Sequence, residues 1–153
     1  MINQLALSNQ VKIRQAQIQD AERIAILSEQ LGYSVTLEEI QQRLSKIINN
    51  DSYIFYVATL TNEYVIGWAQ AHIYEIILMP TQALLHGLVV DENYRNNGIG
   101  KLLMQQIEEW AYDVGCESVQ LRSNVKRKEA HLFYEKIGYT NNKEQKAFHK
   151  ALN

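Results

Sequence analysis

The 153-residue chain contains one cysteine, one proline and no long apolar run. A single cysteine excludes an internal disulfide framework, and no cysteines or histidines have the spacing of metal ligands. An apolar run of roughly 20 residues would be needed to cross a bilayer, and a signal peptide would need a basic start before an apolar segment. The sequence has neither, so we expect a cytoplasmic protein with no metal site.

Charge of one sign is also lacking, because the formal net charge is only -2. The chain therefore has no overall positive field for nucleic acid or an anionic membrane surface, and we expect neither as a partner. A site for an anion must be built locally. The length and the apolar content of 46% suit one globular domain with a hydrophobic core. We expect a flexible polar leader over residues 1–10 and a single domain over 11–153.

The spacing of apolar residues predicts both helices and strands. Thr36 and Glu39 have the spacing of a capping box at the start of a helix. Pro80 is assigned to a connector, and residues 146–152 to a last strand. The other predicted strands cover residues 11–17, 53–60, 64–74, 83–90 and 118–122, and the predicted helices cover 21–31, 37–48, 98–114 and 128–137. This order predicts an α/β fold with a mixed sheet and helices on both faces.

One junction between a strand and a helix has the chemistry of an anion site. The strand ending at Val90 leads into Arg95-Asn96-Asn97-Gly98-Ile99-Gly100-Lys101, which opens an amphipathic helix. The two glycines allow a tight turn and a close approach of the backbone to a ligand. The first free amides of the helix and its dipole favour negative charge, and Arg95 and Lys101 add positive charge. A pyrophosphate group fits here; the plainer alternative is a glycine-rich turn that only feeds a helix.

The glycine spacing excludes two common phosphate loops, because neither G-x-G-x-x-G nor G-x-x-x-x-G-K-[ST] is present. The pattern Arg-x-x-Gly-x-Gly after a strand instead resembles the coenzyme A loop of the GNAT superfamily of acetyl-CoA-dependent N-acetyltransferases. A second segment, Ala130 to Tyr139, contains an aromatic pair and a Gly-aromatic step. It resembles the later strand–helix region of the same family. Together the two segments cover Leu84 to Tyr139.

The resemblance implies a GNAT-like acyl-CoA N-acyltransferase fold, with a mostly antiparallel central sheet splayed between its fourth and fifth strands. Acetyl-CoA, as co-substrate, would insert in the splay, with its pantetheine on strand backbone and its pyrophosphate on the loop amides. The family's asparagine usually stands closer to the alanine of the last helix than Asn124 does, and Arg127 occupies that nearer position. The contact with coenzyme A is therefore left open between these two residues. The implied coenzyme-binding residues are Leu88, Val89, Val90, Arg95, Asn96, Asn97, Gly98, Ile99, Gly100, Lys101, Asn124, Arg127 and Tyr134.

Acetyl transfer to an amine needs a base for the ammonium, a donor for the oxyanion, and a proton or hydrogen bond for the departing thiolate. A backbone N–H of the splayed strand suffices for the oxyanion. By resemblance, Tyr134 would point at the coenzyme sulfur and serve the thiolate. The alternative is that Tyr134 belongs to an ordinary apolar stripe of its helix.

His86 is the candidate base, because it lies on the strand before the loop, where many members of the family place a glutamate. A histidine has an ordinary pKa near 6.5, which suits proton transfer at neutral pH. Strand alternation also places His86 on one face with Leu84, Leu88 and Val90. A hydrogen-bonded core histidine is therefore the alternative interpretation.

The predicted function is transfer of an acetyl group from acetyl-CoA to a primary amine on a small molecule, by direct attack in a ternary complex. His72 and Glu75 are reserve candidates for the base, and Trp68 and Tyr74 are candidates for the acceptor pocket. The alternatives are acetylation of a protein or peptide amine, and a non-catalytic acetyl-CoA-binding module. The resemblance also leaves open a homodimer that pairs through an edge strand.

Overall fold

The computed structural model describes residue 7 and residues 9–153, and it divides into two compact units, 1–122 and 123–153. The flexible leader expected over residues 1–10 falls mostly on residues outside the described part. Of its described residues, Leu7 is buried, and its carbonyl accepts a hydrogen bond from the amide of Gln10.

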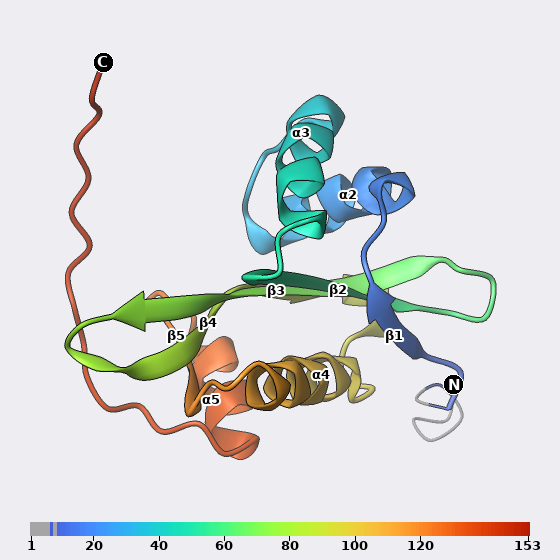
Figure 1. Cartoon of the computed structure of the whole chain (residues 1–153). Coiled ribbons are helices and arrows are strands. Elements are labelled where there is room, and N and C mark those ends of the chain that lie inside the picture. The colour runs from blue at the N-terminus through green and yellow to red at the C-terminus, as the bar shows by residue number, and fades with distance from the viewer. Residues whose placement is uncertain (1–6, 8) are drawn as a thin grey trace. The chain divides into compact units, whose positions relative to one another are not determined.

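The first unit is a sheet with helices on both faces (Figure 1). Helices α2 and α3 cover one face of the sheet, and α4 covers the other. The strands are β1 (Lys12–Gln15), β2 (Tyr53–Thr59), β3 (Val65–Ile76), β4 (Met79–Val90) and β5 (Ser118–Leu121). The helices are α2 (Ala21–Leu31), α3 (Leu37–Ile48) and α4 (Ile99–Asp113), with 3-10 turns η1 (Ile18–Asp20) and η2 (Glu92–Tyr94).

The strands follow one another in the order β1-β2-β3-β4-β5, and every pair is antiparallel except β4 with β5. Antiparallel neighbours can be joined by short turns, whereas the parallel pair needs a long crossover, which here contains α4. The mixed sheet predicted from the order of elements and the mostly antiparallel pairing implied by the resemblance are therefore confirmed.

The expected capping box begins α3. Thr36 Oγ1 accepts a hydrogen bond from the amide of Glu39 at 3.2 Å, and Glu39 Oε2 accepts one from the amide of Thr36 at 3.0 Å. Leu44 is buried, and Ile40 and Ile47 pack on the core beside it. The local sequence thus sets where α3 begins and which of its faces meets the sheet.

Each face of the sheet has its own buried side chains. On one face of the sheet, α4 contributes the buried residues Ile99, Leu103, Met104, Ile107 and Ala111. The face under α2 and α3 holds the cluster Ala16, Ile24, Leu27, Leu44, Phe55, Val57, Val65, Trp68 and Val89. Full burial of a large apolar side chain contributes about 1.5–3 kcal/mol, so both layers hold their helices firmly on the sheet.

Pro80 lies in β4, so its assignment to a connector was wrong. Ile76 of β3 pairs with Met79 of β4, and the turn of the hairpin is Ile77–Leu78. Pro80 is tolerated because it stands at the start of its strand, where a missing N–H costs least.

The second unit contains α5 (Lys128–Lys136), and the last strand expected over residues 146–152 is absent from it. Phe148 and Leu152 are 92% and 96% exposed, so nothing covers the apolar side of this tail. A segment forms a strand only where a neighbouring strand accepts its backbone hydrogen bonds.

Candidate active site

Strands β4 and β5 separate part-way along their length. Their pairing runs from Gln82↔Ser118 to Leu85↔Leu121, where β5 ends, while β4 continues to Val90. Among the described residues, no strand pairs with this edge of β4 beyond Leu85. The splay expected between the fourth and fifth strands therefore begins at His86.

The backbone groups of Leu88 and Val90 point to the open edge. The amide of Asp91 donates to the carbonyl of Ile66 on β3 at 2.8 Å, so Asp91 faces β3. Because successive residues of a strand face opposite edges, Leu88 and Val90 face away from β3. The carbonyl of Val90 accepts a hydrogen bond from Arg95 Nε at 2.9 Å. The open edge thus offers the amide and the carbonyl of Leu88. Of Val90 it offers mainly the amide, because the carbonyl is bonded by Arg95.

The loop that follows is held in shape by its own hydrogen bonds. Asn96 and Gly98 adopt left-handed backbone conformations, with φ of 65° and 79°. Asn97 Nδ2 donates to the carbonyls of Tyr94 and Arg95, both at 3.0 Å. A left-handed residue without strain is usually glycine or asparagine, which explains the choice of residue at both positions.

Helix α4 begins without a side-chain cap, because its N-cap residue is Gly98. The first helical hydrogen bond joins the amide of Leu102 to the carbonyl of Gly98 at 3.1 Å. The amides of Ile99, Gly100 and Lys101 precede it and have no partner inside the helix. Three amides at the positive end of the helix dipole can therefore receive an anion.

An ion pair anchors the entrance to this loop. Arg23 of α2 contacts Asp91 with Nη2 and Oδ2 2.8 Å apart, and Arg23 Nε donates to the carbonyl of Val65 at 3.0 Å. Burial raises the pKa of Asp91, but the amide of Asn93 and the Arg23 guanidinium outweigh it, so this pKa lies below its usual range. Asp91 therefore stays charged at neutral pH, and the end of β4 stays tied to α2.

A β-bulge sets the direction of His86. Gly87 pairs with Gln70 of β3 and Leu85 pairs with Ala71, the next residue of β3. His86, between Leu85 and Gly87, is therefore an extra residue in β4. The bulge reverses the alternation beyond it: Gly87 and Val89 lie on the face of α2 and α3, while Leu88 and Val90 lie on the face of α4. The expectation that His86 shares a face with Leu88 and Val90 was therefore wrong.

His86 forms a pair with His72 of β3. His72 Nδ1 and His86 Nε2 share a hydrogen bond, and the two rings are nearly parallel, with planes 18° and centroids 4.6 Å apart. Tyr53 stacks on His72 at 5.3 Å, and Tyr74 meets it edge-on at 6.0 Å. The reserve candidate His72 and the primary candidate His86 are thus one unit, held by aromatic rings.

Both histidines favour the neutral form. Burial lowers the pKa of His72 below its ordinary value, and burial, His72 and Arg122 lower that of His86. A neutral imidazole has one N–H and one acceptor nitrogen, and the shared bond uses one of each from the pair. Whichever ring donates, one outer nitrogen remains an acceptor and the other outer nitrogen carries a proton. At neutral pH the pair can therefore accept a proton.

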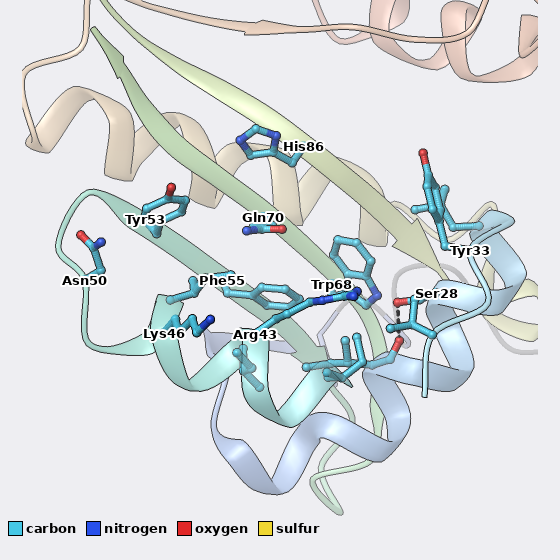
Figure 2. Close-up of a pocket in the computed structure, with 16 residues that line it drawn as sticks. Ser28, Tyr33, Arg43, Lys46, Asn50, Tyr53, Phe55, Trp68, Gln70 and His86 are labelled. Carbon is cyan, nitrogen blue, oxygen red and sulfur yellow. Dashed lines mark hydrogen bonds between the residues drawn. The ribbon is translucent and has the colours of Figure 1, made fainter. Parts of the chain in front are cut away.

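A cavity of about 630 Å³ opens on the face of the sheet that carries His86 (Figure 2). Strands β2, β3 and β4 form its floor, and α2 and α3 form its walls. Trp68, predicted for the acceptor pocket, lines it, whereas Tyr74 does not. The reserve candidate Glu75 is exposed and is not part of the lining. The lining is Ile24, Ser28, Leu31, Tyr33, Val35, Ile40, Arg43, Leu44, Lys46, Ile47, Asn50, Tyr53, Phe55, Trp68, Gln70 and His86.

Most of this lining was missed by the sequence analysis. Arg43 and Lys46 stand on the polar side of the stripe of α3, where long basic residues are normally solvated. Tyr53 and Gln70 alternate with core residues along their strands. Position on an amphipathic helix cannot distinguish a solvated charge from one at the rim of a cavity, so no sequence signal was available.

The second unit holds three of the predicted residues. Asn124 Oδ1 accepts from the amide of Lys126 at 2.9 Å, and its carbonyl bonds the ring of His131 at 2.8 Å. Arg127 is exposed at the N-cap of α5. Asn124 is therefore part of the turn before α5, and Arg127 has the freer side chain.

Tyr134 lies on α5 in an aromatic group with Phe133 and Tyr139, whose ring centroids are 5.1 and 5.9 Å from its own. Burial raises the pKa of Tyr134 to about 12, although Arg127 acts in the opposite direction. The phenol therefore keeps its proton at neutral pH and can act as a donor. Tyr134 can therefore belong to the apolar stripe of its helix and also be a hydrogen-bond donor.

No group of three or more His, Cys, Asp and Glu side chains that could hold a metal ion occurs in the part of the chain that the structure describes. In that same part, no helix is long and apolar enough to cross a membrane.

Two curated proteins resemble the chain in sequence. The uncharacterized N-acetyltransferase YhdJ of Bacillus subtilis (strain 168) is 31% identical over 121 residues, which is 78% of this chain and 84% of that protein. The aminoalkylphosphonate N-acetyltransferase of Salmonella typhimurium is 32% identical over 90 residues, 58% of each protein.

Solved structures share the fold. A glucosamine-6-phosphate N-acetyltransferase from Arabidopsis thaliana has a TM-score of 0.78 and 27% identity over 94% of this chain and 99% of its own. The aminoglycoside N-acetyltransferase AAC(6')-Iy, solved with a bisubstrate analogue of coenzyme A, has a TM-score of 0.81 and 19% identity over 92% and 98%. The sequence profile of the Acetyltransferase (GNAT) family matches residues 18–139. The match to that profile shows that the chain belongs to the GNAT family of acetyltransferases, and the splayed sheet and the uncapped α4 agree with it.

Proposed function

We propose that the protein transfers the acetyl group of acetyl-CoA to a primary amine on a small molecule, by direct attack in a ternary complex. The observation that carries the proposal is the meeting of three features at His86. The unpaired edge of β4 begins there, the His72–His86 pair lies there, and the cavity opens there. A donor on the open edge and an acceptor in the cavity would approach each other at this point.

The residues present fit acetyl-CoA. The open edge of β4 offers the backbone of Leu88 and the amide of Val90 for pantetheine, in the manner of a neighbouring strand. The uncapped amides from Ile99 to Lys101 suit a pyrophosphate. A Cβ at Gly98 would meet no atom within 4 Å, so there is open space beside the loop. When bound, acetyl-CoA supplies the thioester carbon that the amine attacks.

The His72–His86 pair is the proposed base. Only His86 lines the cavity, so the productive arrangement has His86 Nε2 donating to His72 Nδ1, with His86 Nδ1 as the free acceptor. A proton taken up at Nδ1 is stabilised by the bond to His72, and transfer along that bond releases a proton from His72 Nε2. The amine is thereby deprotonated without moving either ring.

Two further groups complete the proposed reaction. The amide of Leu88 or Val90 would donate to the oxygen on which negative charge develops. Tyr134 would donate a hydrogen bond to the leaving sulfur, a role that its raised pKa allows because the phenol keeps its proton. Arg127, rather than Asn124, is the proposed contact of coenzyme A in the second unit, because the Asn124 side chain is already engaged in its own turn.

A small acceptor is favoured over a peptide by the shape of the cavity, which is walled by two helices and is about 630 Å³ in volume. Acceptors on small molecules are also named for the aminoalkylphosphonate and glucosamine-6-phosphate relatives. A non-catalytic acetyl-CoA-binding module would need no base in the cavity, and the neutral histidine pair argues against it.

The first test is calorimetric titration with acetyl-CoA, in parallel with a variant carrying Gly98→Glu and Gly100→Glu. Micromolar binding by the parent and none by the variant would support the donor site, since the new carboxylates repel phosphate. The second test follows thiol release with a panel of amines. Binding of acetyl-CoA without turnover of any amine would leave the binding-module alternative and refute the proposed transferase.

A further inference from the structure

The cavity that carries His86 has an unbalanced charge. Two of its lining residues, Arg43 and Lys46, are basic, and none of them is aspartate or glutamate. Within the described residues, neither basic side chain forms an ion pair with a carboxylate. Two cations without a carboxylate partner beside an apolar cavity attract an anionic group on a ligand that enters the cavity.

The two cations are placed to act together. Arg43 and Lys46 are three residues apart on α3, so their side chains are neighbours on one face of the helix. Figure 2 shows both side chains on the α3 side of the pocket and His86 on the opposite side, on β4. The floor between them carries Tyr53, Phe55 and Gln70, which supply flat apolar surface and one amide.

We infer that the acceptor is a small primary amine that also carries an anionic group: a phosphonate, a phosphate monoester or a carboxylate. The inference rests on the proposed acetyl transfer and names its substrate class. The anion binds between Arg43 and Lys46, and the amino group reaches His86 across the cavity. A guanidinium binds the two oxygens of such groups in a planar fork, while the ammonium adds a point charge.

The same charges disfavour a different class of acceptor. A polycationic amine, such as an aminoglycoside, needs carboxylates for the ammonium groups that are not acetylated, and this cavity offers none among its lining residues. The two basic side chains also repel it. The protein should therefore discriminate between amines by the sign of the charge distant from the reacting nitrogen.

The test compares four short amines of similar length and one longer polyamine on the 153-residue chain saturated with coenzyme A. Calorimetry measures the binding of 2-aminoethylphosphonate, O-phosphoethanolamine, 3-aminopropanoate, 2-aminoethanol and spermidine. We expect at least one anionic amine to bind about tenfold or more tightly than 2-aminoethanol, and spermidine to bind most weakly. The order among the three anionic amines identifies which anion the site takes.

Variants connect this preference to α3. Arg43→Gln should lower the affinity for the preferred anionic amine about tenfold or more, with a smaller loss for Lys46→Gln and no change for 2-aminoethanol. Lys12→Gln, which removes an exposed cation of β1 outside the cavity, is the matched control. Circular dichroism confirms that each variant is folded; Arg43 is exposed, so its loss should not unfold the protein.

Two kinds of failure can be told apart. If amines are acetylated but neutral or polycationic ones bind best, or if Arg43→Gln matches Lys12→Gln, the inference is overturned and the transferase stands. If the anionic amine binds in an Arg43-dependent way but no amine is acetylated, the anion site stands and the proposed function fails.

Discussion

Replacing Gly87 by alanine tests the packing against Trp68, which lines the cavity. A Cβ at Gly87 would lie 2.6 Å from Cη2 and 2.7 Å from Cζ3 of Trp68, closer than such atoms approach in real structures. The indole is only 8% exposed and packs on Phe55 with ring centroids 5.1 Å apart, so a shift of the ring would lose packing. Overpacking of this kind costs about 1–3 kcal/mol, and alanine recovers roughly 0.5–1 kcal/mol of strand preference over glycine. We expect a net loss of about 1–2 kcal/mol in the free energy of unfolding.

The assay is urea unfolding of the parent, Gly87→Ala, Trp68→Phe and the double variant. Phenylalanine removes the ring atoms that the new Cβ would meet, so the double variant should be more stable than the sum of the two single losses predicts, by about 1 kcal/mol. A Gly87→Ala protein as stable as the parent, or strictly additive losses, would refute the argument that glycine is present to make room for Trp68.

Three further predictions concern the site and its anchor. Because the pKa values of His72 and His86 are lowered, kcat/KM should fall only below about pH 6.5. His86→Gln should abolish this fall at low pH and lower kcat about 10²- to 10⁴-fold. An unchanged pH profile in the variant would assign the base elsewhere. Tyr134→Phe should lower kcat about tenfold or more with little change in KM for acetyl-CoA, as measured by thiol release; an unchanged kcat would leave Tyr134 a packing residue. Asp91 has a depressed pKa in the folded state, so its charge stabilises the fold above its unfolded pKa of about 3.9, and this effect is lost as pH falls through the folded pKa. Asp91→Asn should therefore lower the free energy of unfolding by about 1.5–3 kcal/mol at pH 7. In acid the stabilities of the variant and the parent should converge, as followed by urea unfolding across pH. A loss that is independent of pH would show that the charge of Asp91, and hence its pair with Arg23, is not the cause.

The local features of the chain could be predicted because short-range chemistry sets them. Thr36 and Glu39 form the capping box that their spacing indicates. Gly98 adopts the left-handed conformation at the start of α4 that a glycine there permits. The tail, in contrast, forms no strand, because a strand needs a pairing partner that its own residues do not supply, so the prediction was wrong there.

The direction of His86 could not be predicted, because it depends on a bulge between two strands. The sequence pattern assumes strict alternation. One extra residue in β4, His86 between Leu85 and Gly87, reverses the side chains that follow it in that strand. The pair with His72 depends on the same register. Neither histidine indicates the other in the sequence, since they belong to different strands of a hairpin.

The sequence by itself determined the family resemblance, the helix starts and the loop before α4, because each depends on residues within a few positions of one another. Only the tertiary structure decided where β4 leaves β5, that His72 and His86 form one pair, and that Arg43 and Lys46 face a cavity without carboxylates. Such features depend on contacts between elements distant in the chain. Strand register and helix orientation bring those elements together, and both are set by the packing of the whole sheet rather than by any single segment.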